Sequence, residues 1–168
     1  MLDYVHAYGE DQIACTSWVE AVSRLGEPLL QAEFIGADFL AIALGFFSEH
    51  VEDSVTALQR LIRLCVHEEP SPEEAYFFLG YNVSVPLYIR QRLFSRHLNH
   101  DSVIAQMHKP MWLSYGEQDV IVRLSMGQHI ADLAKHAILS VYPQVGHALF
   151  WEVLERFNRE SRAFRESV

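Results

Sequence analysis

Residues 109–122 read Lys-Pro-Met-Trp-Leu-Ser-Tyr-Gly-Glu-Gln-Asp-Val-Ile-Val and carry the clearest structural signal in the chain. An apolar run over 111–115, bounded by a proline and a glycine, predicts a short buried strand. A helical pattern over 124–135 comes next, then a second apolar run over 138–142, then a final helix from about Phe150. Strands that alternate with helices in this way are typical of a parallel sheet with right-handed crossover connections.

Asp119 and His147 follow these two predicted strands. The carboxyl ends of parallel strands meet at one edge of a sheet, where open α/β sheets place their functional sites. The chain between the two residues is long enough for one helix and one strand, so we expect their side chains to meet. A carboxylate placed there holds an imidazole through one ring nitrogen and leaves the other to face a nucleophile. Taken alone, an aspartate and a histidine in loops are more often plain surface residues.

With its proline, apolar strand and Gly-x-x-Asp, the stretch 109–122 resembles the α/β-hydrolase family. Residues 145–152, Val-Gly-His-Ala-Leu-Phe-Trp-Glu, look like the loop that carries that family's catalytic histidine, and residues 155–158 are similar to the start of its last helix. The resemblance implies an α/β protein with a partial α/β-hydrolase fold, in which three parallel strands with flanking helices carry an inserted helical cap. It also implies that Asp119 and His147 are the catalytic acid and base.

The resemblance extends toward the N-terminus. Residues 7–14 look like the end of the helix that follows the nucleophile, and the apolar residues 13–19 look like the next strand, the sixth of the family's sheet. Within the cap the sequence pattern predicts helices and no strand. The resemblance therefore divides the chain into residues 1–25 with the helix end and sixth strand, 26–108 as the helical cap, and 109–168 with the C-terminal core strands and helices.

The family's nucleophile lies on a Gly-x-Ser-x-Gly turn between a strand and a helix, and the 168 residues contain no such motif. Cys15 and Cys65 also lack that context. We expect the turn to lie just before Met1 and the oxyanion-binding loop further upstream, so that the chain is the C-terminal half of a hydrolase and begins at an internal methionine. Without a hydroxyl for His147 to activate, we predict that this chain alone is not a competent serine hydrolase. The strand at 13–19 would lack a neighbour, which predicts a homo-oligomer or a complementary N-terminal fragment across the open edge.

Three functions remain open at this point. The first is the C-terminal half of an enzyme that hydrolyses an ester or similar small acyl substrate through a Ser-His-Asp triad, with no cofactor and no metal. The second is a non-catalytic remnant that associates with another polypeptide through its exposed sheet edge. The third is an enzyme that forms only when a separate N-terminal chain supplies the nucleophile. A truncated gene product with no role of its own also fits the sequence, and the fold does not choose among these because it hosts many reactions.

Aromatic residues supply the candidates for a substrate pocket, with Trp18, Phe77 and Tyr81 as the first choice. Phe77 and Tyr81 belong to a predicted cap helix that also contains Tyr76 and Phe78. Packing of cap helices against one another explains these aromatics equally well, and Trp18 fits a core position near the site. The apolar and aromatic cap favours a hydrophobic acyl or ring group in the substrate.

Two weaker signals have plainer explanations. Glu20 follows the predicted strand at 13–19, where some relatives place their catalytic acid, but a surface or helix-capping role is favoured. His97 and His100 have His-x-x-His spacing with no further carboxylate or cysteine ligand in register, so a polar loop is favoured over a metal site.

Composition limits the remaining classes of protein. The chain has 168 residues, 50% of them hydrophobic, and a formal charge of −9, which fits one folded domain and excludes a disordered chain. The excess of acidic residues argues against binding to nucleic acid or to an anionic membrane surface. No apolar run is long enough to span a bilayer, and the first residues do not resemble a signal peptide. The two cysteines are expected to be buried thiols in a reducing compartment, so we expect a cytoplasmic protein.

Overall fold

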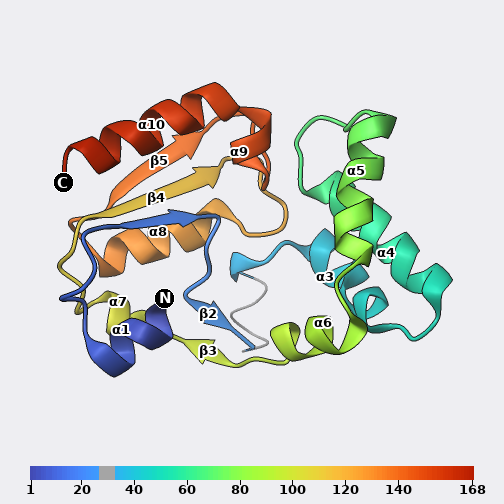
Figure 1. The fold of residues 1–168 in the computed structure, drawn as a ribbon, viewed down its shortest axis with the longest axis horizontal. Helices are drawn as coiled ribbons and strands as arrows, with labels where there is room; N and C mark the ends of the chain where they lie inside the picture. Colours follow the sequence, from blue (N-terminus) through green and yellow to red (C-terminus); the bar gives the residue numbers. More distant parts are fainter. Residues whose placement is uncertain (27–32) are drawn as a thin grey trace.

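The computed structural model describes residues 1–26 and 33–168, and a three-stranded parallel sheet forms its centre (Figure 1). Strand β4 (Met111–Gly116) lies between β1 (Thr16–Val19) and β5 (Ile138–Tyr142). Both pairings are parallel. The predicted α/β architecture, with three parallel strands and flanking helices, is therefore confirmed.

Strand β4 is the central strand, and each of its residues is buried. A strand that is covered on both faces needs a continuous apolar run, which explains why residues 111–115 show no alternation. The two hydroxyl side chains of β4 find partners inside the core. Ser114 Oγ donates to the carbonyl oxygen of Trp18 at 3.3 Å, and the Tyr115 hydroxyl donates to that of Ala21 at 2.6 Å. These bonds link β4 to β1 and to the chain that follows β1.

Helices cover both faces of the sheet (Figure 1). Helices α1 (Leu2–Tyr8), α7 (Asp101–Ile104) and α8 (Leu124–Leu133) contribute apolar side chains to one core cluster together with β1 and β4. Helix α1 packs its apolar face, with Leu2 and Val5, inward.

The opposite face of the sheet is covered by α10 (Leu154–Glu166), which follows the short helix α9 (Leu149–Glu152). The Trp112 ring of β4 packs against the rings of Phe157 and Phe164, with centroid separations of 5.5 and 6.2 Å. These contacts fix α10 over the sheet.

The remaining helices lie together beyond the carboxyl ends of β4 and β5 (Figure 1). A capping box begins one of them: the Ser71 hydroxyl accepts from the Glu74 amide, and the Glu74 side chain accepts from the Ser71 amide. Residues 27–32, at the start of the predicted cap, lie outside the described residues, and the cap boundaries stay a prediction. The helices are α3 (Ala37–Ala43), α4 (Val51–Leu64), α5 (Pro72–Val83) and α6 (Leu87–Phe94), with a 3₁₀ turn η1 (Leu44–Phe47) after α3.

The prediction that the cap region contains no strand is wrong. A short strand β3 (Leu98–Asn99) pairs antiparallel with β2 (Arg24–Leu25). Two residues are too few to set an alternating pattern in the sequence. The pairing arises because the fold brings together two points that are distant along the chain.

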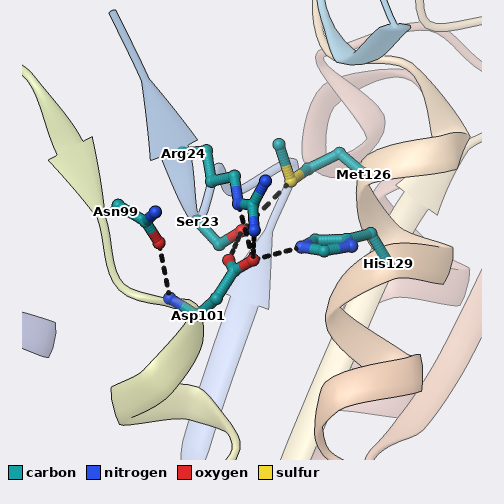
Figure 2. Close-up of polar contacts among 6 residues, drawn as sticks. All are labelled: Ser23, Arg24, Asn99, Asp101, Met126 and His129. Carbon is teal, nitrogen blue, oxygen red and sulfur yellow. Dashed lines mark hydrogen bonds and ion pairs between the residues drawn. The ribbon is translucent and has the colours of Figure 1, made fainter. Parts of the chain in front are cut away.

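A partly buried ionic cluster holds together the places where the chain leaves the sheet and returns to it (Figure 2). We call Ser23, Arg24, Asp101 and His129 the Asp101 cluster. The Asp101 carboxylate accepts from Ser23 Oγ at 2.9 Å and from Arg24 Nε at 2.5 Å, and His129 Nε2 lies 2.8 Å away. Burial acts to raise the pKa of Asp101, but the hydrogen bonds from these three partners outweigh it and hold that pKa below its ordinary value. The charged carboxylate therefore ties β2 to α7 and α8.

Among the described residues, no helix combines the length and the apolar character that a membrane crossing requires.

Candidate active site

Asp119 and His147 meet at the carboxyl ends of β4 and β5. The Asp119 carboxylate oxygen Oδ2 lies 2.8 Å from Nδ1 of His147. The Asp119 side chain is fully buried, whereas 29% of the His147 side chain is exposed. An ionised carboxylate at this place selects the ring tautomer that carries its proton on Nδ1, and Nε2 is then free to accept a proton. The structure thus brings together the two side chains that the sequence singled out.

The Asp119 carboxylate is held in place by its own loop. Its second oxygen, Oδ1, accepts from the backbone amides of Ile121 at 2.7 Å and Val122 at 3.0 Å. This local turn is one that aspartate side chains form readily. The two amide donors fix which oxygen of the carboxylate faces His147.

Gly116 lets the loops of Asp119 and His147 touch. A Cβ atom at this position would overlap the carbonyl oxygens of Val145 and Gly146. Only glycine allows the end of β4 to approach the His147 loop so closely. The glycine in the Gly-x-x-Asp pattern therefore has a steric role in building the site.

Glu152 anchors the His147 loop and was not singled out by the sequence. Its carboxylate accepts from the Gly146 amide at 2.8 Å and from the His67 amide at 2.7 Å. The Ala148 amide donates to the carbonyl oxygen of Cys65 at 2.7 Å. The loop is therefore fastened to the end of α4, on the other side of the site. No local pattern marks a glutamate that bridges segments so distant in sequence.

Glu20 also belongs to the site, and the expectation of a surface or helix-capping role is wrong. The residue is only 5% exposed, and its Oε1 accepts from the Gly116 amide at 2.5 Å. Its φ of 45° lies in the left-handed region, which costs a residue other than glycine about 1 kcal/mol. Gln144, in the loop before His147, has the same kind of backbone, with φ of 59°. Strained backbone of this kind gathers at functional sites.

Glu20, Asp119 and His147 form one group of possible ligand atoms, all within 4.8 Å of one another. In the described part of the chain, His97 and His100 belong to no such group. The His100 ring instead lies 3.4 Å from the Asp3 carboxylate.

An apolar cavity of about 390 Å³ adjoins His147. Nine of the residues that line it are apolar, and three carry polar groups. The lining residues are Glu20, Val22, Leu25, Ile35, Phe39, Leu61, Cys65, Leu93, Phe94, Ile121, Val122 and His147.

Cys65 is half-buried rather than buried as predicted, and neither cysteine is in a disulfide. Burial, with the nearby charges of Asp119 and Glu152, raises the pKa of the Cys65 thiol to about 12. The thiol is therefore no nucleophile at neutral pH.

The three predicted pocket aromatics lie elsewhere. Trp18 is 4% exposed and packs in the core, while Phe77 and Tyr81 are 62% and 53% exposed on α5. Phe77 stacks on Trp151, with ring centroids 6.4 Å apart. None of the three lines the cavity beside His147. Their contact with a substrate stays a prediction.

No protein-family model and no curated protein sequence matches the chain. Solved structures do match it. An esterase from Rhodococcus sp. ECU1013 shares 25% sequence identity with a TM-score of 0.88, and the match covers 99% of this chain and 60% of the esterase. A bromoperoxidase from Bacillus anthracis matches with 14% identity and a TM-score of 0.81, over 98% of this chain and 62% of its own. A meta-cleavage product hydrolase from Pseudomonas fluorescens IP01 matches with 16% identity and a TM-score of 0.75. This match covers 99% of this chain and 60% of the hydrolase.

These structures belong to the α/β-hydrolase fold, and the chain has that fold over the part that it spans. It spans about 60% of the length of the solved structures that it matches. The predicted resemblance is thereby confirmed at the level of the fold.

Proposed function

We propose that this chain supplies the acid–base pair of an esterase-type hydrolase, with the serine nucleophile outside these 168 residues. The observation that carries the proposal is the hydrogen bond of 2.8 Å between Asp119 and His147 at the carboxyl ends of neighbouring strands. His147 takes the proton of the serine hydroxyl as its oxygen attacks the acyl carbon, and returns that proton to the leaving alcohol. Asp119 orients the imidazole and stabilises the imidazolium that forms.

The apolar cavity supports a small, uncharged acyl substrate. Among the described residues that line it, none is a lysine or an arginine. A carboxylate on the group that enters the cavity would lose its hydration with no cation to compensate for the loss. Trp18, Phe77 and Tyr81 remain candidates for other contacts. The proposed reaction needs neither a cofactor nor a metal, and we place it in the cytoplasm, which suits two unpaired cysteines.

The chain alone is expected to show no acyl-enzyme burst with a p-nitrophenyl ester and no labelling by a fluorophosphonate probe. The reason is that no serine of the chain lies in a Gly-x-Ser-x-Gly turn, the motif that would bring its hydroxyl to His147. Stopped-flow absorbance and mass spectrometry of the labelled protein measure both quantities, with His147→Ala as the matched background. A burst that His147→Ala abolishes would show that a nucleophile lies within the chain.

The coding DNA just upstream of Met1 tests where the nucleophile comes from. We expect an in-frame Gly-x-Ser-x-Gly within a few codons, after which an esterase screen on the longer chain follows. A frameshift or a missing motif there would contradict this and favour a nucleophile from a separate chain, or no catalysis at all.

A second candidate function is association with another polypeptide through the edge of β1, without catalysis. In the described part of the chain, β1 pairs with β4 alone. The amides of Thr16 and Glu20 donate toward β4, so those of Ser17 and Val19 point to the open side. An open edge of this kind is a template for a further strand.

Multi-angle light scattering is expected to find a dimer or larger species, and Ser17→Pro is expected to convert it to a monomer. Proline removes an amide donor on the open side and leaves the β1–β4 ladder intact. Ser17→Ala is the control and should keep the wild-type mass. A stable, monodisperse wild-type monomer would rule out self-association through this edge.

A further inference from the structure

Two buried carboxyl groups lie against each other at the base of the candidate site. Glu20 is 5% exposed and the Asp119 side chain is fully buried. An oxygen of each lies within 4.8 Å of the other and of a His147 ring nitrogen. Two ionised carboxylates this close repel each other strongly, because little water is present to screen them. A proton on one of them, or a cation between them, is therefore required.

The hydrogen bonds indicate which group holds the proton. Both oxygens of Asp119 already face donors, namely two backbone amides and His147. Glu20 has one such donor, the Gly116 amide at Oε1, while its buried Oε2 has no partner in the described part of the chain. Buried polar atoms are rarely left unpaired. An oxygen with no donor, next to a charged acceptor, suits the O–H of a protonated acid.

The electrostatic surroundings agree with this assignment. Burial and the Asp119 charge raise the pKa of Glu20 well above its ordinary value, Glu152 acts in the same direction, and the Gly116 hydrogen bond opposes them. Among the described residues, the other titratable neighbours of the carboxyl pair, besides His147 and Glu152, are Tyr115 and Cys65. Burial raises the pKa of both, and the charge of Asp119 raises it further, so both are neutral at neutral pH.

We propose that Glu20 is a neutral carboxylic acid whose O–H donates to Asp119, so that it positions the carboxylate that holds His147. Asp119 then accepts from four donors, and the group carries one negative charge. The left-handed backbone at Glu20 gives the chain the turn that points this side chain toward the end of β4. The meaning of the bond for catalysis rests on the proposed function, whereas the proton itself does not.

The pH dependence of folding tests the proton without any substrate. An acid whose pKa is raised by folding contributes its full stability below its unfolded pKa, about 4.3 for glutamate, and loses it as the pH rises toward the folded value. Glu20→Gln keeps an oxygen for Gly116 and an N–H for Asp119 but has no proton to lose. We compare the equilibrium constant for folding of Glu20→Gln with that of the wild type. We expect the ratio of the variant's constant to the wild-type constant to rise about tenfold per pH unit above about pH 5.

Urea unfolding over a range of pH values measures this ratio, with the exposed Glu155→Gln as the control for loss of one charge. A purely structural role for Glu20 would give a ratio that does not change with pH. A Glu20 that is ionised in the folded protein would give a ratio that stays constant or falls as the pH rises. Either result overturns the proposal. In an Asp119→Asn background we expect the rise of this ratio to level off at a lower pH, because one of the two main causes of the raised pKa of Glu20 has been removed. A rise that continues to the same pH as in the Asp119 background would overturn Asp119 as the acceptor.

A second measurement covers the case in which Asp119→Asn fails to fold. Infrared spectra of the folded wild type at neutral pH should contain a protonated carboxyl band that Glu20→Gln removes. A wild-type spectrum without that band would contradict the proposal. So would zinc binding, by calorimetry, that Glu20→Gln abolishes, because a cation would then occupy the place of the proton. Failure of the hydrolase proposal leaves all of these readouts unaffected.

Discussion

His147→Ala is expected to lower kcat for a phenyl ester about 10⁵-fold. The protein to be assayed combines this chain with the segment that carries the Gly-x-Ser-x-Gly turn. The imidazole is the base that removes the serine proton, and no other histidine among the described residues lies beside the cavity. KM should change little, because an apolar acyl group gains its binding energy from the cavity walls rather than from the ring. The change would thus fall on the chemical step.

Steady-state kinetics on purified protein give both constants. His136→Ala is the matched control, since that exposed ring lies 3.0 Å from the carbonyl oxygen of Lys109 and does not line the cavity. We expect wild-type kcat from the control. If His147→Ala kept more than a tenth of the wild-type kcat, His147 would not be the base, and the proposed function would fail.

Asp119→Ala is expected to lower the free energy of unfolding by about 4 kcal/mol. The alanine leaves the amides of Ile121 and Val122 and the Nδ1–H of His147 without an acceptor, in addition to the proposed O–H of Glu20. It also opens a small void, because the Asp119 side chain is fully buried. Buried groups that lose their partner cost more than the same bond contributes when it is intact.

Urea unfolding followed by circular dichroism measures this loss, provided that the m-value stays constant. Asp132→Ala is the control, because its carboxylate is exposed and pairs with Lys135 at 2.7 Å on the surface. A surface pair of this kind contributes less than about 1 kcal/mol. Equal losses in the two variants would mean that Asp119 does not hold its loop and His147 as the geometry indicates.

The central strands and the two functional loops were predictable because their signals are local. Residues 111–115 and 138–142 are apolar runs with clear ends, and each is followed within a few positions by a polar residue. Parallel order then places both loops at one edge, so the meeting of Asp119 and His147 follows from strand direction alone.

The rest of the site was not predictable, since it depends on contacts between distant segments. Glutamate usually lies at the surface, and the burial of Glu20 results from β4 lying beside β1. Glu152 likewise acts by reaching the amide of His67 across the site. The two-residue ladder of β2 and β3 has no sequence pattern of its own. In each of these cases tertiary packing decides a role that the local sequence leaves open.

The Asp101 cluster has a consequence for how this fold tolerates change. Arg24 and Asp101 are held together by an ion pair, although most of the helical region lies between them in the sequence. The two ends of that long segment are therefore held side by side, next to where the chain leaves β1 and approaches β4. Insertions whose ends lie close together disturb their host least. A helical segment of another shape could therefore take the place of this one with its ends held as they are, provided that it also supplies the contacts that Cys65 and His67 make with the His147 loop.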